Sequence, residues 1–320
     1  MITLSIIIPV YKVEDYVGQC LQSVFDGGHD ESLYEVIVVN DGTPDKSMDV
    51  VRRVCAGHDN VKIIEQDNQG LSAARMAGLA KAEGEYVWFV DSDDWLEIGA
   101  VDIILKILSK NTLYSVYIMP LIWTGTRENR CDYVIDEDIP FFNNDVFNTG
   151  FPLPAIQRYV IHHELLKEDG VYFPLGLIHE DEYFYRVVLY RASSVLTLKS
   201  PLYYYRQRDN SIMNSRTIQS FYDIVSIYRQ LQVFRKSIVS LSDQGWFQRD
   251  ISSFLLRGYK DSYMIPEGYT FRRKYRWFVF AEGMKCGKFS LKEKAWIVGL
   301  LFFSRVLRIV TRAERVGINT

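Results

Sequence analysis

The amino-acid sequence predicts an α/β fold in which a mostly parallel sheet is flanked by helices and followed by a helical C-terminal region. Short apolar runs alternate with segments of helical apolar spacing through the first hundred residues, an order typical of parallel sheets with helices on both faces. From Ser220 onward the chain reads as helices. The composition, 48% hydrophobic and 24% charged over 320 residues, is that of a packed domain and excludes global disorder.

Each element of the first hundred residues follows from its apolar pattern. Four short apolar runs predict strands, at Leu4–Val10, Val36–Val39, Val61–Ile64 and Tyr86–Val90. Three helices are predicted between these strands. Apolar residues recur at helical spacing in the first two, at Val17, Cys20, Leu21 and Val24 and at Val50, Val51 and Val54. The third is the alanine-rich stretch Leu71–Ala82. Sheets of this kind bind ligands at the carboxyl ends of their strands, where polar clusters follow two of these runs.

The middle of the chain has a mixed pattern. Strands are predicted at Tyr114–Ile118, Val195–Leu198 and Leu202–Tyr205, a helix at Glu180–Tyr190 and a polar loop at Asn143–Gly150. The sequence contains no internal repeat and no low-complexity linker. On these patterns we divide the chain into residues 1–110, 111–215 and 216–320.

Carboxylates directly follow two of the predicted strands. Asp91 and Asp93 come after Tyr86–Val90, and alternate residues of an extended segment point the same way. Such a pair suits a hard cation such as Mn²⁺ or Mg²⁺, which could bridge the phosphates of a nucleotide diphosphate. The competing interpretation is a helix N-cap. The segment Asn40–Thr43 is equally compatible with a turn and with a carboxylate that accepts a hydrogen bond from a base N–H.

Four motifs in this order resemble glycosyltransferase family 2, which has the GT-A fold. They are SIIIPVY at Ser5–Tyr11, VNDGTPD at Val39–Asp45, NQGLSAAR at Asn68–Arg75 and DSDD at Asp91–Asp94. Any one of them alone would be a weak signal, whereas four in order are specific. The chain departs from the family at Met76, where asparagine is usual. The resemblance implies that residues 1–110 bind a nucleotide-sugar and that residues 111–215 bind the acceptor.

The resemblance also implies roles for single residues. Those expected to bind the donor are Pro9, Tyr11 and Glu14 around the base and ribose, Asp41 at the uracil, and Arg75, Asp91 and Ser92 around the phosphates. Asp93 is the expected direct ligand of Mn²⁺ or Mg²⁺.

A second acidic cluster lies at His179–Glu182. An inverting transfer needs one base that removes the proton of the acceptor hydroxyl. The residues alone favour an acidic first turn of a helix, stabilised by the helix dipole. The resemblance to the Glu-Asp motif of the family implies instead that Asp181 is the base, with Glu180 and His179 supporting it or contacting the acceptor. Arg206 and Arg208, after three tyrosines, are expected to close over the donor diphosphate.

The two ends of the chain differ in charge. Residues 1–100 hold 18 Asp/Glu against 7 Lys/Arg, whereas residues 270–320 hold 12 Lys/Arg against 3 Asp/Glu. The apolar segment Trp296–Phe303 is followed by Arg305, Arg308 and Arg312. This pattern fits a helix on an anionic membrane surface or a helix packed on the catalytic domain. We predict peripheral membrane contact through residues 216–320, and no nucleic-acid partner.

The cysteines indicate a reducing compartment. Cys20, Cys55, Cys131 and Cys286 have neither zinc-site nor dithiol spacing. The N-terminus has no basic leader, and the sequence has no uninterrupted apolar run of about 20 residues, so neither a secretory signal nor a membrane span is expected. The expected location is the cytoplasm, peripheral at the inner face of the cell membrane.

The sequence therefore predicts a metal-dependent inverting glycosyltransferase of the hexosyl or N-acetylhexosaminyl type. It would move a sugar from a nucleotide-sugar, with a UDP-sugar as the expected donor, to a hydroxyl of a glycan or lipid-linked saccharide in bacterial surface-polysaccharide synthesis. A non-catalytic nucleotide-sugar or glycan-binding module is one alternative, and Asp41, Asp93 and Asp181 together argue against it. A sugar nucleotidyltransferase is another, and the glycine-free turn at Pro9–Lys12 argues against that. The chain has no G-x-G-x-x-G after a strand, which disfavours an oxidoreductase.

Overall fold

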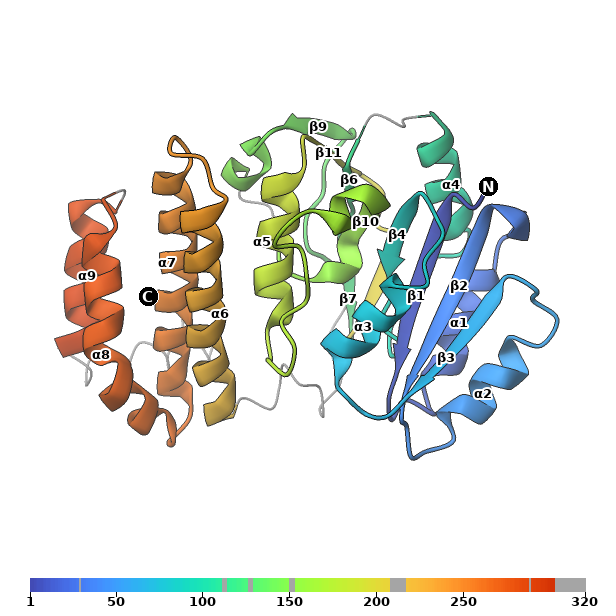
Figure 1. Ribbon diagram of the computed structural model, residues 1–320, viewed down its shortest axis with the longest axis horizontal. Coiled ribbons are helices and arrows are strands. Elements are labelled where there is room, and N and C mark those ends of the chain that lie inside the picture. The colour runs from blue at the N-terminus through green and yellow to red at the C-terminus, as the bar shows by residue number, and fades with distance from the viewer. Residues whose placement is uncertain are drawn as a thin grey trace. The chain divides into compact units, whose positions relative to one another are not determined.

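The computed structural model describes residues 1–28, 30–110, 114–125, 129–149, 153–207, 217–287 and 289–302. Contacts divide the chain into two compact units. The first comprises Met1–Gly176 with Glu180–Asp209, and the second comprises Leu177–His179 with Asn210–Thr320. A sheet with flanking helices forms the first unit, and helices dominate the second (Figure 1). The predicted fold class is confirmed, whereas the division at residues 110 and 215 stays a prediction.

The first unit is built on an eight-stranded sheet with the order β3-β2-β1-β4-β10-β6-β11-β9. Its strands are β1 (Leu4–Val10), β2 (Tyr34–Asp41), β3 (Val61–Gln66), β4 (Tyr86–Phe89), β6 (Val116–Ile118), β9 (Ile139–Phe142), β10 (Tyr159–His162) and β11 (Ser194–Thr197). The pairs β3-β2, β2-β1, β1-β4 and β6-β11 are parallel, whereas β10 and β9 pair antiparallel to their neighbours. Parallel pairing brings the carboxyl ends of β1, β2 and β4 to one edge.

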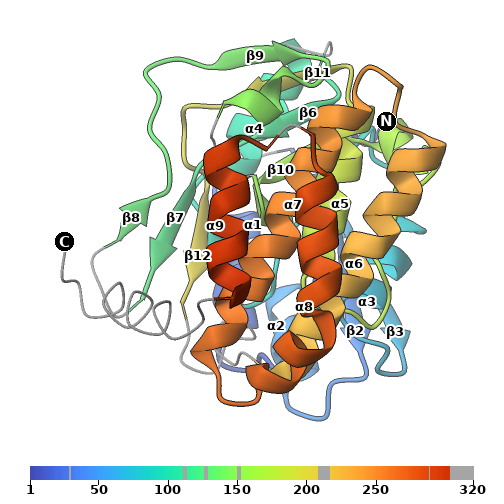
Figure 2. The same cartoon turned by 90° about the vertical axis from the view of Figure 1, so that its left-hand side faces the viewer.

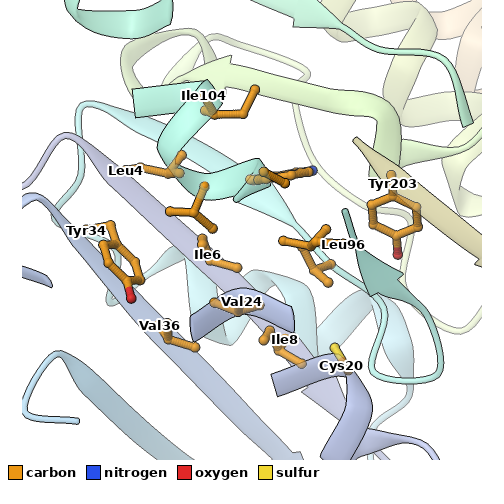
Figure 3. Close-up of a cluster of buried hydrophobic side chains, with 14 of the residues drawn as sticks. Leu4, Ile6, Ile8, Cys20, Val24, Tyr34, Val36, Leu96, Ile104 and Tyr203 are labelled. Carbon is orange, nitrogen blue, oxygen red and sulfur yellow. The ribbon is translucent and has the colours of Figure 1, made fainter. Parts of the chain in front are cut away.

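Helices cover both faces of this sheet (Figure 1). They are α1 (Val17–Phe25), α2 (Ser47–Val54), α3 (Leu71–Leu79), α4 (Ala100–Lys110) and α5 (Glu180–Arg191). Successive strand residues point to opposite faces, so Ile6 and Ile8 of β1 lie in a buried cluster with Val24 of α1 and Ile104 of α4 (Figure 3). The neighbouring Ile7 points to the other face of the sheet, beneath α3.

One glycine sets how closely α3 approaches that second face. A Cβ atom built on Gly78 would lie 2.4 Å from Cγ2 of Ile7 and 3.2 Å from Cγ2 of Val39. No side chain fits at that distance, so glycine is required for α3 to rest on β1 and β2. This contact fixes the helix that carries Arg75.

A smaller sheet, unforeseen from the sequence, lies in the same unit. It has the order β5-β12-β7-β8, with β5 (Trp95–Leu96), β7 (Leu121–Thr124), β8 (Arg130–Cys131) and β12 (Tyr203–Arg206). Strand β12 pairs antiparallel with β5, which directly follows the DSDD motif. The small sheet therefore brings residues 203–206 beside Asp91–Asp94.

Most predicted elements of the first unit are present, with shifted ends. The predicted polar loop at Asn143–Gly150 contains a short 3₁₀ helix at Asp145–Asn148. The side chain of Val146 in this helix is buried. The other 3₁₀ segments of this unit are Glu31–Leu33, Ile156–Arg158 and His163–Lys167. Strands β5, β7, β8, β9 and β10 were not predicted, since each spans only two to four residues and shows too little periodicity.

The second unit contains α6 (Ile218–Ser237), α7 (Gln244–Asp261), α8 (Gly268–Lys285) and α9 (Leu291–Phe302), with a 3₁₀ turn at Ser262–Met264. Helix α8 contacts α6, α7 and α9, and it lies side by side with α9 (Figure 2). The helical character predicted from Ser220 onward is confirmed for the described residues. Within that part of the chain, no helix is both long enough and apolar enough to cross a membrane.

Candidate active site

Three carboxylates gather in the loop that follows β4. One oxygen each from Asp91, Asp93 and Asp94 lie within 4.8 Å of one another. The loop is tightened by a hydrogen bond of 3.1 Å from the Asp94 N–H to the Asp91 carbonyl. Ser92, in the same loop, is buried. The sequence therefore placed these carboxylates together correctly, and the structure adds Asp94 to the pair that it singled out.

Asp94 anchors this loop to the smaller sheet. Its buried carboxylate accepts a hydrogen bond of 2.7 Å from the Tyr203 hydroxyl and another of 2.7 Å from the Arg206 N–H. Burial, together with the charges of Asp93 and Asp91, raises the pKa of Asp94 well above its usual range, although both hydrogen bonds oppose the shift. Tyr203 is a fully buried residue that the sequence did not single out.

Asp91 is held by two further side chains. Its Oδ1 accepts from Arg75 Nη2 at 2.8 Å, and its Oδ2 accepts from Nε2 of Gln157. Gln157 is buried in the 3₁₀ segment before β10, and its backbone carbonyl accepts a hydrogen bond of 2.8 Å from the Trp88 indole N–H. Gln157 was missed because nothing near it in the sequence suggests a polar site. These contacts fix the orientation of the Asp91 carboxylate.

Arg75 joins the DSDD loop to the second acidic cluster. Its guanidinium pairs with Asp91 at 2.8 Å and with Glu180 at 2.7 Å, and it lies over the Phe173 ring at 5.2 Å. Only 1% of Arg75 is exposed. Burial lowers the pKa of Arg75, but the charges of Asp91 and Glu180 outweigh burial and raise it. The cation therefore bridges two carboxylates that lie 89 positions apart in the chain (180 − 91).

Asp181 lies at the start of α5, next to the Glu180 that Arg75 binds. Its carboxylate accepts a hydrogen bond of 2.9 Å from the N–H of Glu182. Burial and the negative charges of Glu180 and Glu182 raise the pKa of Asp181 to about 7, against an opposing effect of Arg75. A carboxyl group with such a pKa exchanges a proton near neutral pH, as a general base must. His179, one residue before α5, has a φ of 71°, a conformation rare outside glycine.

A polar network joins the loops after β1 and β2. The Glu14 N–H donates to Asp45 at 3.1 Å, and the Lys46 N–H donates back to Glu14 at 2.8 Å. The Lys12 N–H donates to the Thr43 hydroxyl at 2.8 Å, which in turn donates to Asp45 at 2.7 Å. Both loops are therefore fixed relative to each other at the edge where nucleotide binding was predicted.

Two other residues predicted to contact the donor lie at the end of β1 and just after it. Pro9 is buried within β1, opposite Val39 of β2. Tyr11 is 41% exposed, so its ring is accessible to a base, and the Lys12 ammonium lies 5.0 Å from its centre.

Asp41, at the end of β2, organises the loop that leads into α3. Its Oδ1 accepts from Gln66 Nε2 at 2.7 Å and from the Gln69 N–H at 2.8 Å, and its Oδ2 accepts from the Gly70 N–H at 2.9 Å. The next residue, Gly42, has a φ of 63°, and a Cβ there would lie 2.8 Å from the Asn68 nitrogen. Asp41 therefore has a structural role in this loop, in line with the turn considered from the sequence, and its predicted contact with uracil stays a prediction.

Arg206 lies across the outer side of the DSDD loop. Its Nε donates to the Asp93 carbonyl at 2.7 Å and its Nη2 donates to Gln19 at 2.6 Å. The guanidinium also lies over the rings of Trp95, at 4.4 Å, and Tyr16, at 5.1 Å. The position beside Asp93 is compatible with the predicted role near the diphosphate. Arg208 lies outside the described residues, so its predicted role stays a prediction.

The donor set of the loop fits a divalent metal ion. Mn²⁺ and Mg²⁺ prefer oxygen ligands, and the cluster of Asp91, Asp93 and Asp94 provides carboxylate oxygens within 4.8 Å. Each carboxylate has about four lone-pair positions, so the hydrogen bonds to Asp91 and Asp94 leave acceptor capacity.

Comparison with known sequences identifies the family. A model of the family described as glycosyl transferase family 2 matches residues 5–147. Residues 5–147 therefore carry a glycosyltransferase family 2 domain. EpsH of Bacillus subtilis is 28% identical over 264 residues, which cover 79% of this chain and 74% of EpsH. Glycosyltransferase GlyA of Streptococcus pneumoniae is 29% identical over 226 residues, covering 65% of this chain and 31% of GlyA. The resemblance stated from the four motifs is confirmed.

Among solved structures, the fold of this chain is similar to that of TarS of S. aureus. Residues 1–349 of TarS superpose with a TM-score of 0.69 at 19% identity, covering 99% of this chain and 92% of that one. The same fragment in complex with UDP-GlcNAc superposes with a TM-score of 0.64, again at 19% identity and with the same coverage. At this identity the likeness establishes the fold.

Proposed function

We propose that this glycosyltransferase moves a sugar from a UDP-sugar, with inversion at the anomeric carbon, to a hydroxyl of a glycan or lipid-linked saccharide. The observation that carries the proposal is the Arg75 bridge. It links the carboxylate cluster at Asp91–Asp94, which suits a diphosphate and its metal ion, to α5, where Asp181 titrates near neutral pH. An acid–base group and a diphosphate site in one unit are the two parts that such a transfer requires.

A UDP-sugar is proposed as the donor on two grounds. The family resemblance implies that Asp41 contacts the uracil, and Asp41 ends the β2 strand at the edge where the loop network lies. TarS, whose fold is similar, has been crystallised with UDP-GlcNAc and with UDP. The proposed residues around the base and ribose are Pro9, Tyr11 and Glu14, and those around the phosphates are Arg206 and Arg208.

The proposed reaction is a single displacement. The acceptor oxygen attacks the anomeric carbon while the bond from that carbon to the diphosphate oxygen breaks, and UDP leaves with the electron pair. Asp181 accepts the proton of the acceptor hydroxyl, with Glu180 and His179 beside it in the sequence. One displacement inverts the configuration, so no covalent sugar–enzyme intermediate forms.

Asp93, with Asp91, is proposed to hold Mn²⁺ or Mg²⁺. When bound, the cation would neutralise charge on the leaving diphosphate. The chain itself supplies the fixed orientation of Asp91, through Arg75 and Gln157, and of the loop, through Asp94. Arg206 is proposed to add a positive charge on the outer side.

The proposed biological setting is synthesis of a bacterial surface polysaccharide in the cytoplasm, at the inner face of the cell membrane. Besides EpsH and GlyA, the chain is 38% identical over 95 residues to the poly(ribitol-phosphate) beta-glucosyltransferase of Bacillus spizizenii, covering 29% of this chain and 15% of that protein. The basic C-terminal region is the proposed membrane contact.

Nucleotide release without acceptor tests the donor site. The protein is incubated with Mn²⁺ and a panel of UDP-, GDP- and dTDP-sugars, and the free nucleotide is assayed. We expect slow release from one UDP-sugar, its loss with EDTA, and its loss in Asp93→Asn. Asp59→Asn is the matched control, because Asp59 is exposed on the loop before β3.

The outcomes separate the competing functions. Release that survives EDTA and Asp93→Asn would contradict the metal assignment. The absence of release from every donor, together with the absence of UDP–Mn²⁺ binding by calorimetry, would overturn the donor site. UDP–Mn²⁺ binding that Asp93→Asn abolishes, without release, would support the donor site and indicate an obligatory acceptor.

A further inference from the structure

Helix α8 exposes a face that combines large apolar side chains with a cation. Tyr269 is 57% exposed and Trp277 is 65% exposed, and Met284 and Arg273 are also exposed. Phe280 is partly exposed, and its ring meets that of Trp277 edge-on at 6.0 Å. At about 100° per residue, these five positions fall within an arc of about 80°. They are called the α8 face below.

Positions outside the α8 face provide the packing of the helix, with Phe271 on the opposite side and Gly283 next to the face. Phe271 is buried against the rings of Phe221, at 5.7 Å, and Tyr259, at 6.1 Å. Gly283 lies so close to α9 that a Cβ there would come within 2.9 Å of Ile297 Cδ1. These contacts hold α8 within the second unit, while the α8 face presents a tryptophan and a tyrosine to solvent.

The charge around this face is strongly positive. Residues 268–302 hold eight Lys/Arg and two Asp/Glu. Both acids are already paired: Glu282 accepts from Lys285 at 3.1 Å and from the Tyr228 hydroxyl at 2.7 Å, and Glu293 pairs with Arg249 at 3.0 Å. Arg273 lies within the α8 face, and the exposed Lys274 lies next to it in the sequence.

We propose that the α8 face binds the surface of an anionic lipid membrane. Tryptophan and tyrosine favour the membrane–water interface because each has an apolar ring and a polar group. Each cation near an anionic surface strengthens binding by severalfold, since it contributes about 1 kcal/mol, which is about a fivefold change. This inference rests on the proposed function, and it assigns the proposed membrane contact to named residues of α8.

Charge argues against a second copy of the chain as the occupant. In a symmetric dimer the same patch meets itself, so two copies of Arg273 and its basic surroundings would face each other. Like charges facing each other in an interface are unfavourable. An anionic lipid surface instead complements the cations and accepts the aromatic rings.

Vesicle binding by the full chain tests the proposal. Co-sedimentation is measured with phosphatidylcholine vesicles that contain 30% phosphatidylglycerol, about a third anionic lipid as a probe of surface charge, and with pure phosphatidylcholine vesicles. We expect the parent protein to bind the anionic vesicles. Binding should be at least about tenfold weaker in Arg273→Glu, and weaker again in the double variant Arg273→Glu/Trp277→Ser. Lys106→Glu is the matched control, because Lys106 is an exposed cation of α4 in the first unit. It should retain binding within about twofold.

Several results would overturn the proposal. They are equal binding to neutral vesicles, the same loss in Lys106→Glu as in Arg273→Glu, and no vesicle binding at all. Self-association that Trp277→Ser abolishes, without vesicle binding, would identify a second copy as the occupant. Nucleotide release by the same variants in solution should stay unchanged, so failure of this inference is distinguishable from failure of the proposed function.

Discussion

Two carboxylates of the first unit, Asp41 and Asp181, have opposite surroundings. Asp41 accepts three hydrogen bonds from N–H groups of Gln66, Gln69 and Gly70. Asp181 accepts one hydrogen bond among the described residues, from the N–H of Glu182, and has acidic neighbours on both sides. A carboxylate surrounded by fixed donors holds a loop in place, whereas one with few donors and negative neighbours binds a proton more readily. The comparison separates a structural acid from a candidate base.

The largest expected effect is that of Asp181→Asn. The substitution removes the proposed base, so kcat for transfer to an acceptor should fall by about 10²–10⁴-fold. UDP–Mn²⁺ affinity should stay the same, because Asp181 lies on α5 rather than in the loops around the base. Folding stability should not fall, since the neutral amide removes the repulsion with Glu180 and Glu182.

Single-turnover kinetics with saturating donor and acceptor measure this effect. Asp59→Asn, in an exposed loop, is the matched control for the amide substitution and should keep full activity. An unchanged rate in Asp181→Asn would show that Asp181 is not the base. The contrast drawn between Asp181 and Asp41 would then have no catalytic meaning.

The next effect is on stability, from Arg75→Met. This variant leaves Asp91 and Glu180 without their shared cation in a buried site. The free energy of unfolding should decrease by about 3 kcal/mol, as is common when one partner of a buried ion pair is removed. Urea denaturation measures it. Arg52→Met is the control, because Arg52 forms its ion pairs in solvent, with side chains more than half exposed, and should cost less than about 1 kcal/mol.

The contrast between the Arg75–Glu180 contact and the four sequence motifs shows what the sequence could reveal. Strands β1 to β4 and the loops after them were predicted because apolar period and turn residues are local signals. The Arg75–Glu180 pair joins residues 105 positions apart, and the bond from Tyr203 to Asp94 joins residues 109 positions apart. Neither partner changes the local pattern of the other, so these contacts needed the fold.

The sequence was least informative for the smaller sheet. Its strands β5 and β8 have two residues each, too few for any period to appear. Gln157 lies in a 3₁₀ segment and Tyr203 in the predicted strand Leu202–Tyr205. Their support of the DSDD loop was not identified, because Gln157 lies 66 positions from Asp91 and Tyr203 lies 109 positions from Asp94. The roles of Pro9, Tyr11, Glu14 and Ser92 in donor binding come from the family resemblance and stay predictions.

A smaller effect is expected from Asp41→Asn, which sharpens the comparison with Asp181. The amide has one acceptor oxygen and brings an NH₂ group to face an N–H donor, so at least one bond to Gln66, Gln69 or Gly70 is lost. We expect a loss of about 1–3 kcal/mol in stability, as for an unsatisfied buried donor. Calorimetry should also show weaker UDP binding, because the loop before α3 is loosened. A stable Asp41→Asn protein with normal UDP affinity would contradict the structural role.

The smallest expected effect is a pH dependence that Asp181 alone should produce. With a pKa of about 7, Asp181 is mostly protonated at pH 6, so kcat/KM should be about tenfold lower there than its plateau above pH 8. The linked effect on stability has the opposite sign. Because the folded-state pKa lies above the usual 3.8, this carboxyl contributes stability that is fully present below about pH 4 and is lost as the pH rises to about 7.

Chemical denaturation of the parent protein and of Asp181→Asn between pH 4 and 8 isolates this linkage. The difference in unfolding free energy between the two proteins should shift in favour of the variant as the pH rises, because only the parent must ionise a partly buried carboxyl beside Glu180 and Glu182. A difference that does not change with pH would mean that Asp181 ionises as freely as an exposed aspartate. In that case, the small number of hydrogen bonds that Asp181 accepts would not distinguish its ionisation from that of other aspartates. The base would then have to be another residue of α5.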